Sequence, residues 1–385
     1  MIIHTVKAGE SLGSVAARYG ASPLKLAAIN GLRTDELIEG EELLVLIPTR
    51  TANARRGENL SELARRYGVR QSSLLLMNPE LSPTGELYDG QPITVRSEPP
   101  LFGLGIGNGY LYRGASREEL MRAMPYMSYL TVASAVGRRG GIYKLFEGAP
   151  MAELARAAGR LTLLRLYLAE GENLSAELLR SAALMARSEG YDGLTLAGMP
   201  PYSPLLCEGQ KMLSELELKL VLELDAAQPI PDSCPCDFTV LSYDKIHLDS
   251  IPAPEVGEES ILGDYAERHN AVRTFIDLSP FAYSGGKYVT KDEMRRALLS
   301  RGGKIGEICR GTKIGVAGKR GREREWVFES LTGVQGRLKL LSELGYYGIS
   351  FDVARTPIAE LMMFGTMFSA AMCLGAAPSG RCASI

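Results

Sequence analysis

An internal repeat at the start of the chain constrains the fold more than any other feature of the sequence. When residues 9–30 are aligned with residues 57–78, nine of the 22 positions are identical. The identical pairs are Gly9/Gly57, Glu10/Glu58, Leu12/Leu60, Ala16/Ala64, Arg18/Arg66, Tyr19/Tyr67, Gly20/Gly68, Leu26/Leu74 and Asn30/Asn78. Such a match at one fixed spacing indicates a duplicated structural unit. Apolar residues recur at helical spacing within each copy and short apolar runs flank them, so each copy is predicted to be a β-α-α-β unit.

Both copies resemble the LysM (lysin motif) pattern. The residues that carry the resemblance in the first copy are His4 to Leu12, Ala16, Tyr19, Leu26, Asn30, Leu32, Gly40 and residues 43–48; in the second they are Gly57, Leu60, Ala64, Tyr67, Asn78, Leu81, Gly90, Gln91 and Val95. LysM modules bind glycans that contain N-acetylglucosamine, such as peptidoglycan or chitin, in a shallow groove. The resemblance places the first groove at Gly9, Glu10, Ser11, Leu12, Ile29, Asn30, Gly31, Leu37 and Ile38, and the second at Gly57, Glu58, Asn59, Leu60, Met77, Asn78, Pro79 and Leu87.

The charge of the repeats fits a neutral ligand. Residues 1–96 contain 11 basic and 11 acidic side chains, and the whole chain has a net charge of −2, which argues against nucleic acid as a partner. An acetamido sugar needs backbone amides and apolar surface, and glycine-rich turns expose backbone. The alternative is that these residues only build the fold and that the groove has lost its affinity.

The rest of the chain alternates strand-like apolar runs with helical patterns. The expected strands are residues 101–106, 129–136, 161–168, 193–196, 219–224, 238–242, 274–278 and 348–353. Eight strands with helices between them predict an α/β (β/α)8 TIM barrel, with an open doubly wound sheet as the alternative. The expected domains are repeat 1 (residues 1–49), repeat 2 (50–96), a linker (97–100) and the barrel (101–385).

The segment from Arg187 to Met199 resembles the signature strand of glycoside hydrolase family 18, the chitinase-type barrels. That strand reads Asp-Gly-x-Asp-x-Asp-x-Glu, and its last Glu protonates the leaving oxygen while the Asp two residues earlier positions the substrate's N-acetyl group. Here the start of the motif is present, but Thr195, Ala197 and Met199 occupy the three carboxylate positions. The resemblance therefore implies a catalytically degenerate barrel with no catalytic residue, whose centre we expect to pack as an apolar core. The arrangement of two LysM modules before such a barrel resembles bacterial spore cortex-lytic N-acetylglucosaminidases.

Four acidic residues and a tyrosine near the ends of the expected strands could still form a sugar cleft. The candidates are Asp225, Tyr243, Asp244, Asp277 and Asp352. Tyr243 and Asp244 match a substrate-contacting pair of the family, whereas Asp352 stands where the family has a tryptophan. The basic segment 304–324 is expected to be a solvated hairpin, with contact to an anionic wall polymer as the alternative.

These features predict a peptidoglycan-binding protein with a degenerate chitinase-like barrel. The alternatives are an active N-acetylglucosaminidase with a relocated carboxylate, and a structural scaffold that binds spore coat proteins. The chain start lacks the pattern of a secretory signal, and the longest apolar stretch, residues 361–374, is too short to span a membrane, so synthesis in the cytoplasm and deposition in the spore coat or cortex are expected. No cofactor and no metal are expected, since the cysteine and histidine spacings of a zinc site are missing.

Overall fold

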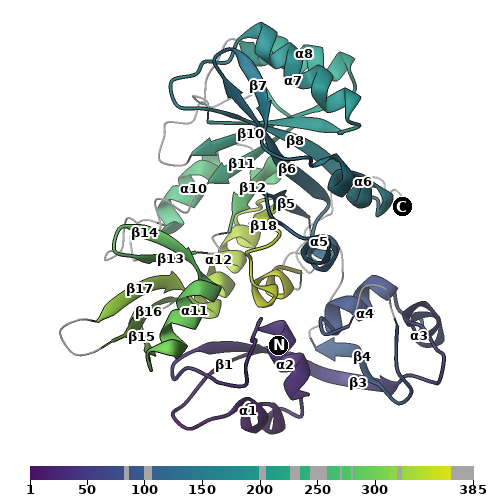
Figure 1. Cartoon of the computed structure of the whole chain (residues 1–385), viewed down its shortest axis with the longest axis vertical. Helices are drawn as coiled ribbons and strands as arrows, with labels where there is room; N and C mark the ends of the chain where they lie inside the picture. Colours follow the sequence, from purple (N-terminus) through teal and green to yellow (C-terminus); the bar gives the residue numbers. More distant parts are fainter. Residues whose placement is uncertain are drawn as a thin grey trace.

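The computed structural model describes residues 1–81, 86–98, 106–198, 205–225, 235–242, 258–268, 271–278, 281–309, 311–318 and 323–365. Within these residues the chain forms a pair of small repeats, a barrel, and a sheet inserted late in the barrel (Figure 1). Repeat 1 lies between repeat 2 and the inserted sheet, at the lower end of the view.

The two repeats have the predicted β-α-α-β order. Repeat 1 contains β1 (Ile2–Thr5), α1 (Leu12–Arg18), α2 (Pro23–Ile29) and β2 (Glu42–Val45). Repeat 2 contains β3 (Ile47–Asn53), α3 (Leu60–Tyr67), α4 (Gln71–Met77) and β4 (Pro92–Glu98). The first helix of each repeat begins with a capping box, at Ser11 and at Asn59, in which side chain and backbone groups satisfy each other's hydrogen bonds. The predicted linker begins inside β4, because Ser97 and Glu98 pair with Pro48 and Ile47.

The repeats are joined through a buried lysine rather than a flexible connection. Lys25 on α2 donates hydrogen bonds to Asn78 Oδ1 at 2.6 Å and to Thr94 Oγ1, both in repeat 2. Its Nζ also lies 3.5 Å from Glu80. Burial lowers the pKa of Lys25 and raises that of Glu80, since desolvation disfavours both charges. These contacts fix the two repeats relative to each other.

Eight parallel strands form the predicted barrel. They are β5 (Gly107–Leu111), β6 (Tyr129–Arg138), β8 (Leu161–Leu168), β9 (Gly193–Ala197), β10 (Lys219–Asp225), β11 (Phe238–Ser242), β12 (Thr274–Asp277) and β18 (Gly348–Asp352). Each strand pairs with the next, and β5 pairs with both β18 and β6, which closes the ring. An antiparallel strand, β7 (Gly141–Lys144), extends β6.

The first barrel strand lies later than the sequence predicted. The expected strand at 101–106 falls mostly outside the described residues, and the observed strand is Gly107–Leu111. Its Gly-Asn-Gly start has low strand propensity, so pattern alone favoured the apolar run before it. Tertiary packing explains the glycines, because a Cβ at Gly107 would lie 2.3 Å from the Tyr126 carbonyl oxygen.

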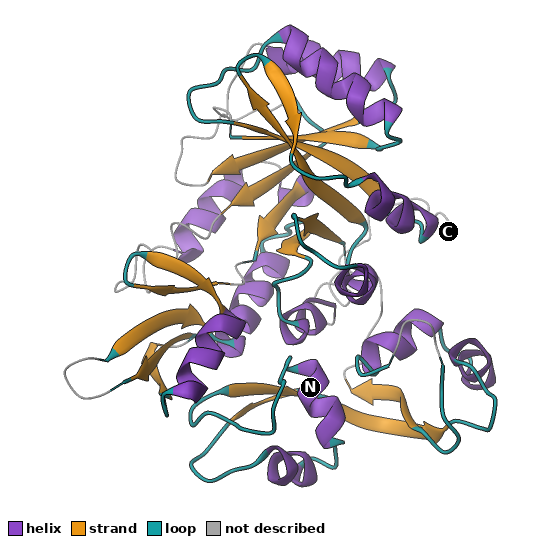
Figure 2. Cartoon of the chain, in the orientation of Figure 1, coloured by secondary structure: helices purple, strands orange, loops and turns teal. Residues whose placement is uncertain are grey.

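Helices cover the outside of the barrel strands (Figure 2). They are α5 (Arg117–Ala123), α6 (Ala149–Ala157), α7 (Ala176–Ser188), α8 (Leu205–Glu215), α10 (Glu258–Arg268) and α12 (Leu331–Glu343). Leu194 and Leu196 of β9 belong to the same core as the buried face of α7. Residues 358–365 are also helical, and none of the described helices is long and apolar enough to cross a membrane.

The region between β12 and β18 is a folded sheet, and the described part of its basic segment forms the expected hairpin, with residues 304–309 paired to residues 312–317. Its strands are β13 (Phe281–Ser284), β14 (Lys287–Thr290), β15 (Lys304–Cys309), β16 (Thr312–Ala317) and β17 (Arg324–Glu329), with α11 (Lys291–Ser300) packed against them. All pairings in this inserted sheet are antiparallel. Its core contains the buried Trp326 and Met294 together with Ile38 of repeat 1. The expected solvation of the hairpin is wrong at Lys313, because this charged side chain is buried against Glu42 of repeat 1.

Two glycines allow a matched test of the contact between repeat 1 and the inserted sheet. Gly40 (φ +85°) and Gly90 (φ +78°) are both left-handed, so alanine strains each by about 1–2 kcal/mol. A Cβ at Gly40 would also lie 1.9 Å from the Ile305 carbonyl oxygen, whereas one at Gly90 would meet nothing described within 4 Å. We expect Gly40→Ala to lower the thermal unfolding midpoint more than Gly90→Ala does. Equal shifts would contradict a tight contact.

Candidate functional site

The loop from Gly9 to Leu12 is shaped by an internal network around Glu10. The carboxylate accepts hydrogen bonds from the Lys7 backbone N–H at 2.9 Å and from His4 Nε2 at 2.8 Å, and Arg18 Nη2 lies 2.6 Å away. The Lys7 amide, then His4, lowers the pKa of Glu10 to about 2, so the loop keeps this charge across the physiological range. Glu10 therefore orders the loop. Gly9 and Ser11 are exposed, so the backbone of the loop is accessible from solvent.

The two asparagines expected in the grooves hold each repeat together. Asn30 Nδ2 donates to the carbonyls of Leu26 and Leu44, and its Oδ1 accepts from Leu44 N at 2.7 Å. Asn78 makes the same set of bonds to Leu74 and Thr94. Each side chain thus ties the second helix to the closing strand. Leu12, Ile29, Leu60 and Met77, also expected in the grooves, are buried in the cores of the repeats.

The second repeat keeps an equivalent loop. Glu58 accepts from the Arg55 backbone N–H at 2.9 Å and pairs with Arg66 at 2.8 Å, in the place of the Glu10 network. Asn59 caps α3 through the N–H of Glu62. Pro79 and Leu87 are half-buried, so part of each side chain remains open to solvent.

Ile38 faces the inserted sheet, which corrects its expected place in an open groove. Its side chain is 2% exposed and packs in the core that contains Met294 and Trp326. Beside it, the Ile305 backbone N–H donates to the Glu39 carbonyl oxygen at 2.9 Å. One wall of the first predicted groove is therefore covered by the inserted sheet. The neighbouring Leu37 is only half-buried, so part of its side chain is open to solvent.

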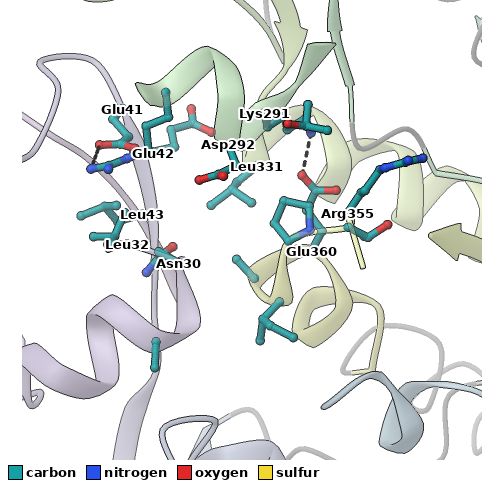
Figure 3. Close-up of a pocket in the computed structure, with 18 of the residues that line it drawn as sticks. Asn30, Leu32, Glu41, Glu42, Leu43, Lys291, Asp292, Leu331, Arg355 and Glu360 are labelled. Atoms are coloured by element: carbon teal, nitrogen blue, oxygen red, sulfur yellow. Dashed lines mark hydrogen bonds and ion pairs between the residues drawn. The ribbon is translucent and has the colours of Figure 1, made fainter. Parts of the chain in front are cut away.

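A cavity of about 720 Å³ lies between repeat 1, the inserted sheet and the segment after β18 (Figure 3). Asn30 and Leu32 line one side, and Lys291, Arg355 and Glu360 line the other. Glu360 is buried and its carboxylate lies 2.6 Å from Lys291 Nζ. Burial raises the pKa of Glu360, and the nearby lysine opposes that effect. The cavity is of the size that holds small ligands, and its charges are largely paired.

The barrel interior contains an ion pair that the sequence analysis missed. Arg165 on β8 donates from Nε and Nη2 to the two carboxylate oxygens of Glu223 on β10, each at 2.7 Å. Tyr110 on β5 donates its hydroxyl to Glu223 at 3.0 Å, and the Arg165 guanidinium lies 5.3 Å from the Tyr167 ring centroid. The sequence does contain a signal for these residues, because a charged side chain in the middle of an apolar strand-like run is unusual.

The ion pair flanks β9, the strand that resembles the signature strand of the family. Thr195 lies opposite Arg165 on one side and Val221 on the other, and both Thr195 and Ala197 are fully buried. Met199 lies outside the described residues. The expectation of a wholly apolar centre is thus wrong. One layer of the barrel interior is apolar, with Tyr129, Val221 and Phe275 in one cluster. Arg165 and Glu223, however, place a pair of charges beside β9.

The remaining candidate carboxylates end barrel strands, as predicted. Asp225, Asp277 and Asp352 are the last residues of β10, β12 and β18. Asp352 Oδ1 accepts from the backbone N–H groups of Ala354 and Arg355, both at 2.9 Å, yet burial raises its pKa. Parallel strands bring these ends to one face of the barrel. Tyr243 and Asp244 lie outside the described residues, so their place in the cleft stays a prediction.

Comparison with known proteins agrees with this geometry. The LysM domain model matches residues 4–45 and 54–96. The chain carries two LysM domains. It is 31% identical over 134 residues to the putative sporulation-specific glycosylase YdhD of Bacillus subtilis, a match that covers 34% of this chain and 31% of that relative. The chain therefore spans about a third of the length of this curated relative.

Solved structures match the whole arrangement or the barrel alone, and they show the fold. The Bacillus cereus spore cortex-lytic enzyme SleL has a TM-score of 0.66 at 19% identity, over 95% of this chain and 98% of SleL. The chitinase-like agglutinin from Robinia pseudoacacia has a TM-score of 0.56 at 13% identity, over 68% of this chain and 99% of the agglutinin. Two LysM domains followed by a chitinase-like TIM barrel thus describe this chain.

The buried ion pair offers a test of the barrel interior. The Arg165 side chain is 13% exposed and the Glu223 side chain is 20% exposed. Replacing either one alone, in Arg165→Met or Glu223→Gln, leaves the other as a mostly buried charge without its partner, and we expect a loss of about 3–5 kcal/mol in unfolding free energy. The double variant should lose less than the sum of the two. The exposed pair Arg122–Glu118 is the control and should show coupling of about 0.5 kcal/mol or less. Denaturant unfolding measures both cycles, and additive losses at Arg165 and Glu223 would contradict the pairing.

Proposed function

We propose that this chain binds N-acetylglucosamine polymers of the bacterial cell wall, above all peptidoglycan, through its LysM domains. The single observation that carries the proposal is the pair of LysM domains with intact, capped loops at Gly9 to Leu12 and Gly57 to Leu60. The exposed backbone of these loops supplies hydrogen-bonding groups without net charge, which is what a neutral acetamido sugar requires.

We further propose that the barrel does not cleave these polymers. Thr195 and Ala197 provide no carboxylate to orient an acetamido group. Glu223 on the neighbouring strand β10 has both carboxylate oxygens engaged by Arg165, so it is not free to protonate a leaving oxygen. Loss of a general acid alone costs roughly 10²–10⁴ in rate. The fold itself does not decide the matter, because the same architecture occurs in chitinases and in an agglutinin.

Binding should depend little on salt. Hydrogen bonds to a neutral sugar and apolar contacts are not screened by ions, so the full-length protein should be retained on insoluble peptidoglycan to within about twofold between low and high salt. A sedimentation assay with purified sacculi measures this. Protein that stays in the supernatant at every salt concentration would contradict the proposal, and retention that disappears in high salt would indicate a charge-driven contact instead.

A hydrolase with a relocated carboxylate is the second candidate function. The observation in its favour is Asp352, whose pKa is raised by burial at the barrel rim, as a general acid requires. Against it, two backbone N–H groups and Arg355 already contact this carboxylate.

The two functions differ in turnover. We expect no release of reducing ends from peptidoglycan or chitooligosaccharides by the purified protein, because the acid and the orienting carboxylate of the family are replaced. Sustained turnover that is abolished by Asp352→Asn, Asp225→Asn or Asp277→Asn, and retained in the exposed-site control Glu118→Gln, would establish the second candidate.

We propose the spore envelope as the place of action, with coat proteins as neighbours. The support is the description of SleL as a spore cortex-lytic enzyme and of YdhD as sporulation-specific. A fluorescent fusion should gather around the developing spore; a fusion that remains evenly distributed through sporulation would contradict this placement.

A further inference from the structure

The turn that follows the second helix of repeat 1 has a defined pattern of hydrogen bonds. Gly40 N donates to the Val6 carbonyl oxygen at 2.9 Å, and Glu41 N donates to the Ile38 carbonyl oxygen at 3.0 Å. The Ile38 backbone N–H in turn donates to the Glu41 side chain at 3.2 Å. These bonds attach the turn to the strand that leads into the loop of Gly9.

Repeat 2 contains the same turn, and Tyr88 takes the place of Ile38 in it. Gly90 N donates to the Ala54 carbonyl oxygen at 2.9 Å, and Gln91 N donates to the Tyr88 carbonyl oxygen at 3.1 Å. The Tyr88 backbone N–H donates to the Gln91 side chain at 3.0 Å. Matching bonds at matching positions make Ile38 and Tyr88 structural counterparts.

The turn of repeat 1 is covered by the inserted sheet. Ile38 is buried with Trp326, as described above, and a side chain at Gly40 would collide with Ile305. Ion pairs surround this contact: Arg295 Nε lies 2.6 Å from Glu41, and Lys313 Nζ lies 3.0 Å from Glu42. The Arg295 and Lys313 side chains are themselves mostly buried, so water is largely excluded from this face of the turn.

The turn of repeat 2 is open. The Tyr88 side chain is 65% exposed, next to the half-buried Leu87, and no described atom lies within 4 Å of a Cβ built at Gly90. Through Ala54, this turn lies against the strand that leads into the loop of Gly57 to Leu60. An exposed aromatic ring thus stands beside the residues predicted to form the second groove, where repeat 1 has a buried aliphatic side chain.

We infer that the two LysM domains have different roles: repeat 1 anchors the pair to the barrel, and repeat 2 carries the sugar-binding site, with Tyr88 as the platform for an N-acetylglucosamine ring. A tyrosine provides a large flat apolar surface with little conformational entropy to lose, which is why it recurs where binding energy is concentrated. The inference rests on the proposed function, since it states which of the two domains performs it.

The experiment compares variants of the full-length chain in binding to a soluble N-acetylglucosamine hexamer and to insoluble peptidoglycan. We expect Tyr88→Ala to weaken binding at least tenfold and Tyr88→Phe to change it less than about threefold, because the ring provides the contact. Tyr143→Ala is the matched control, since Tyr143 is another exposed tyrosine (54%) on the barrel hairpin and should have no effect. Titration calorimetry should give one hexamer per chain.

The outcomes separate the two proposals. If the unmodified protein binds neither sugar, the proposed function and the inference both fail. If it binds and Tyr88→Ala binds equally well, or if two hexamers bind per chain, the function stands and the division of roles is overturned. Circular dichroism of Tyr88→Ala, whose side chain is mainly in solvent, confirms that any loss of binding is not a loss of folding.

Discussion

The contact between the turn of repeat 1 and the inserted sheet is the constraint on which the arrangement of the molecule depends. Its apolar part is Ile38, which packs in the same core as Trp326. Its polar part is a backbone hydrogen bond from Ile305 to Glu39, together with two buried ion pairs, Arg295–Glu41 and Lys313–Glu42. Breaking one member of such a pair leaves a buried charge without compensation, so the contact strongly favours one relative position. Since Lys25 fixes repeat 2 to repeat 1, the barrel positions both LysM domains.

This arrangement gives each unit a distinct part in the proposed function. The barrel contributes the inserted sheet that holds repeat 1, while its own interior is filled beside β9 by Arg165 and Glu223. Repeat 1 forms one wall of a 720 Å³ cavity against the barrel, and repeat 2 extends away from that contact (Figure 1). A barrel that orients a glycan-binding module needs a rigid surface more than it needs a reactive carboxylate, which is consistent with the replacements at Thr195 and Ala197.

Much of the fold could be predicted because its signals are local. The duplicated Gly-Glu pair and the helical spacing after it predicted both β-α-α-β units, and seven of the eight barrel strands follow apolar runs that periodicity detects. The strand at Gly107 was missed because its glycines are favoured by close packing against Tyr126, which no local pattern reveals. The inserted sheet was missed because its charged residues resemble a solvated surface, although Lys313 is buried against Glu42.

The sequence by itself determined the two LysM units, the barrel class and the residues Thr195 and Ala197 on β9, since these depend on residue identity and on spacing along the chain. The tertiary structure decided which charges meet. Arg165 and Glu223 are 58 residues apart and pair only because strand order places β8 and β10 on either side of β9. In the same way, Ile38 and Tyr88 occupy equivalent turns, and only the packing of distant segments buries one and leaves the other exposed. Such contacts form only when the whole fold closes, and a pattern along the chain does not contain the spatial distance between residues that are far apart in sequence.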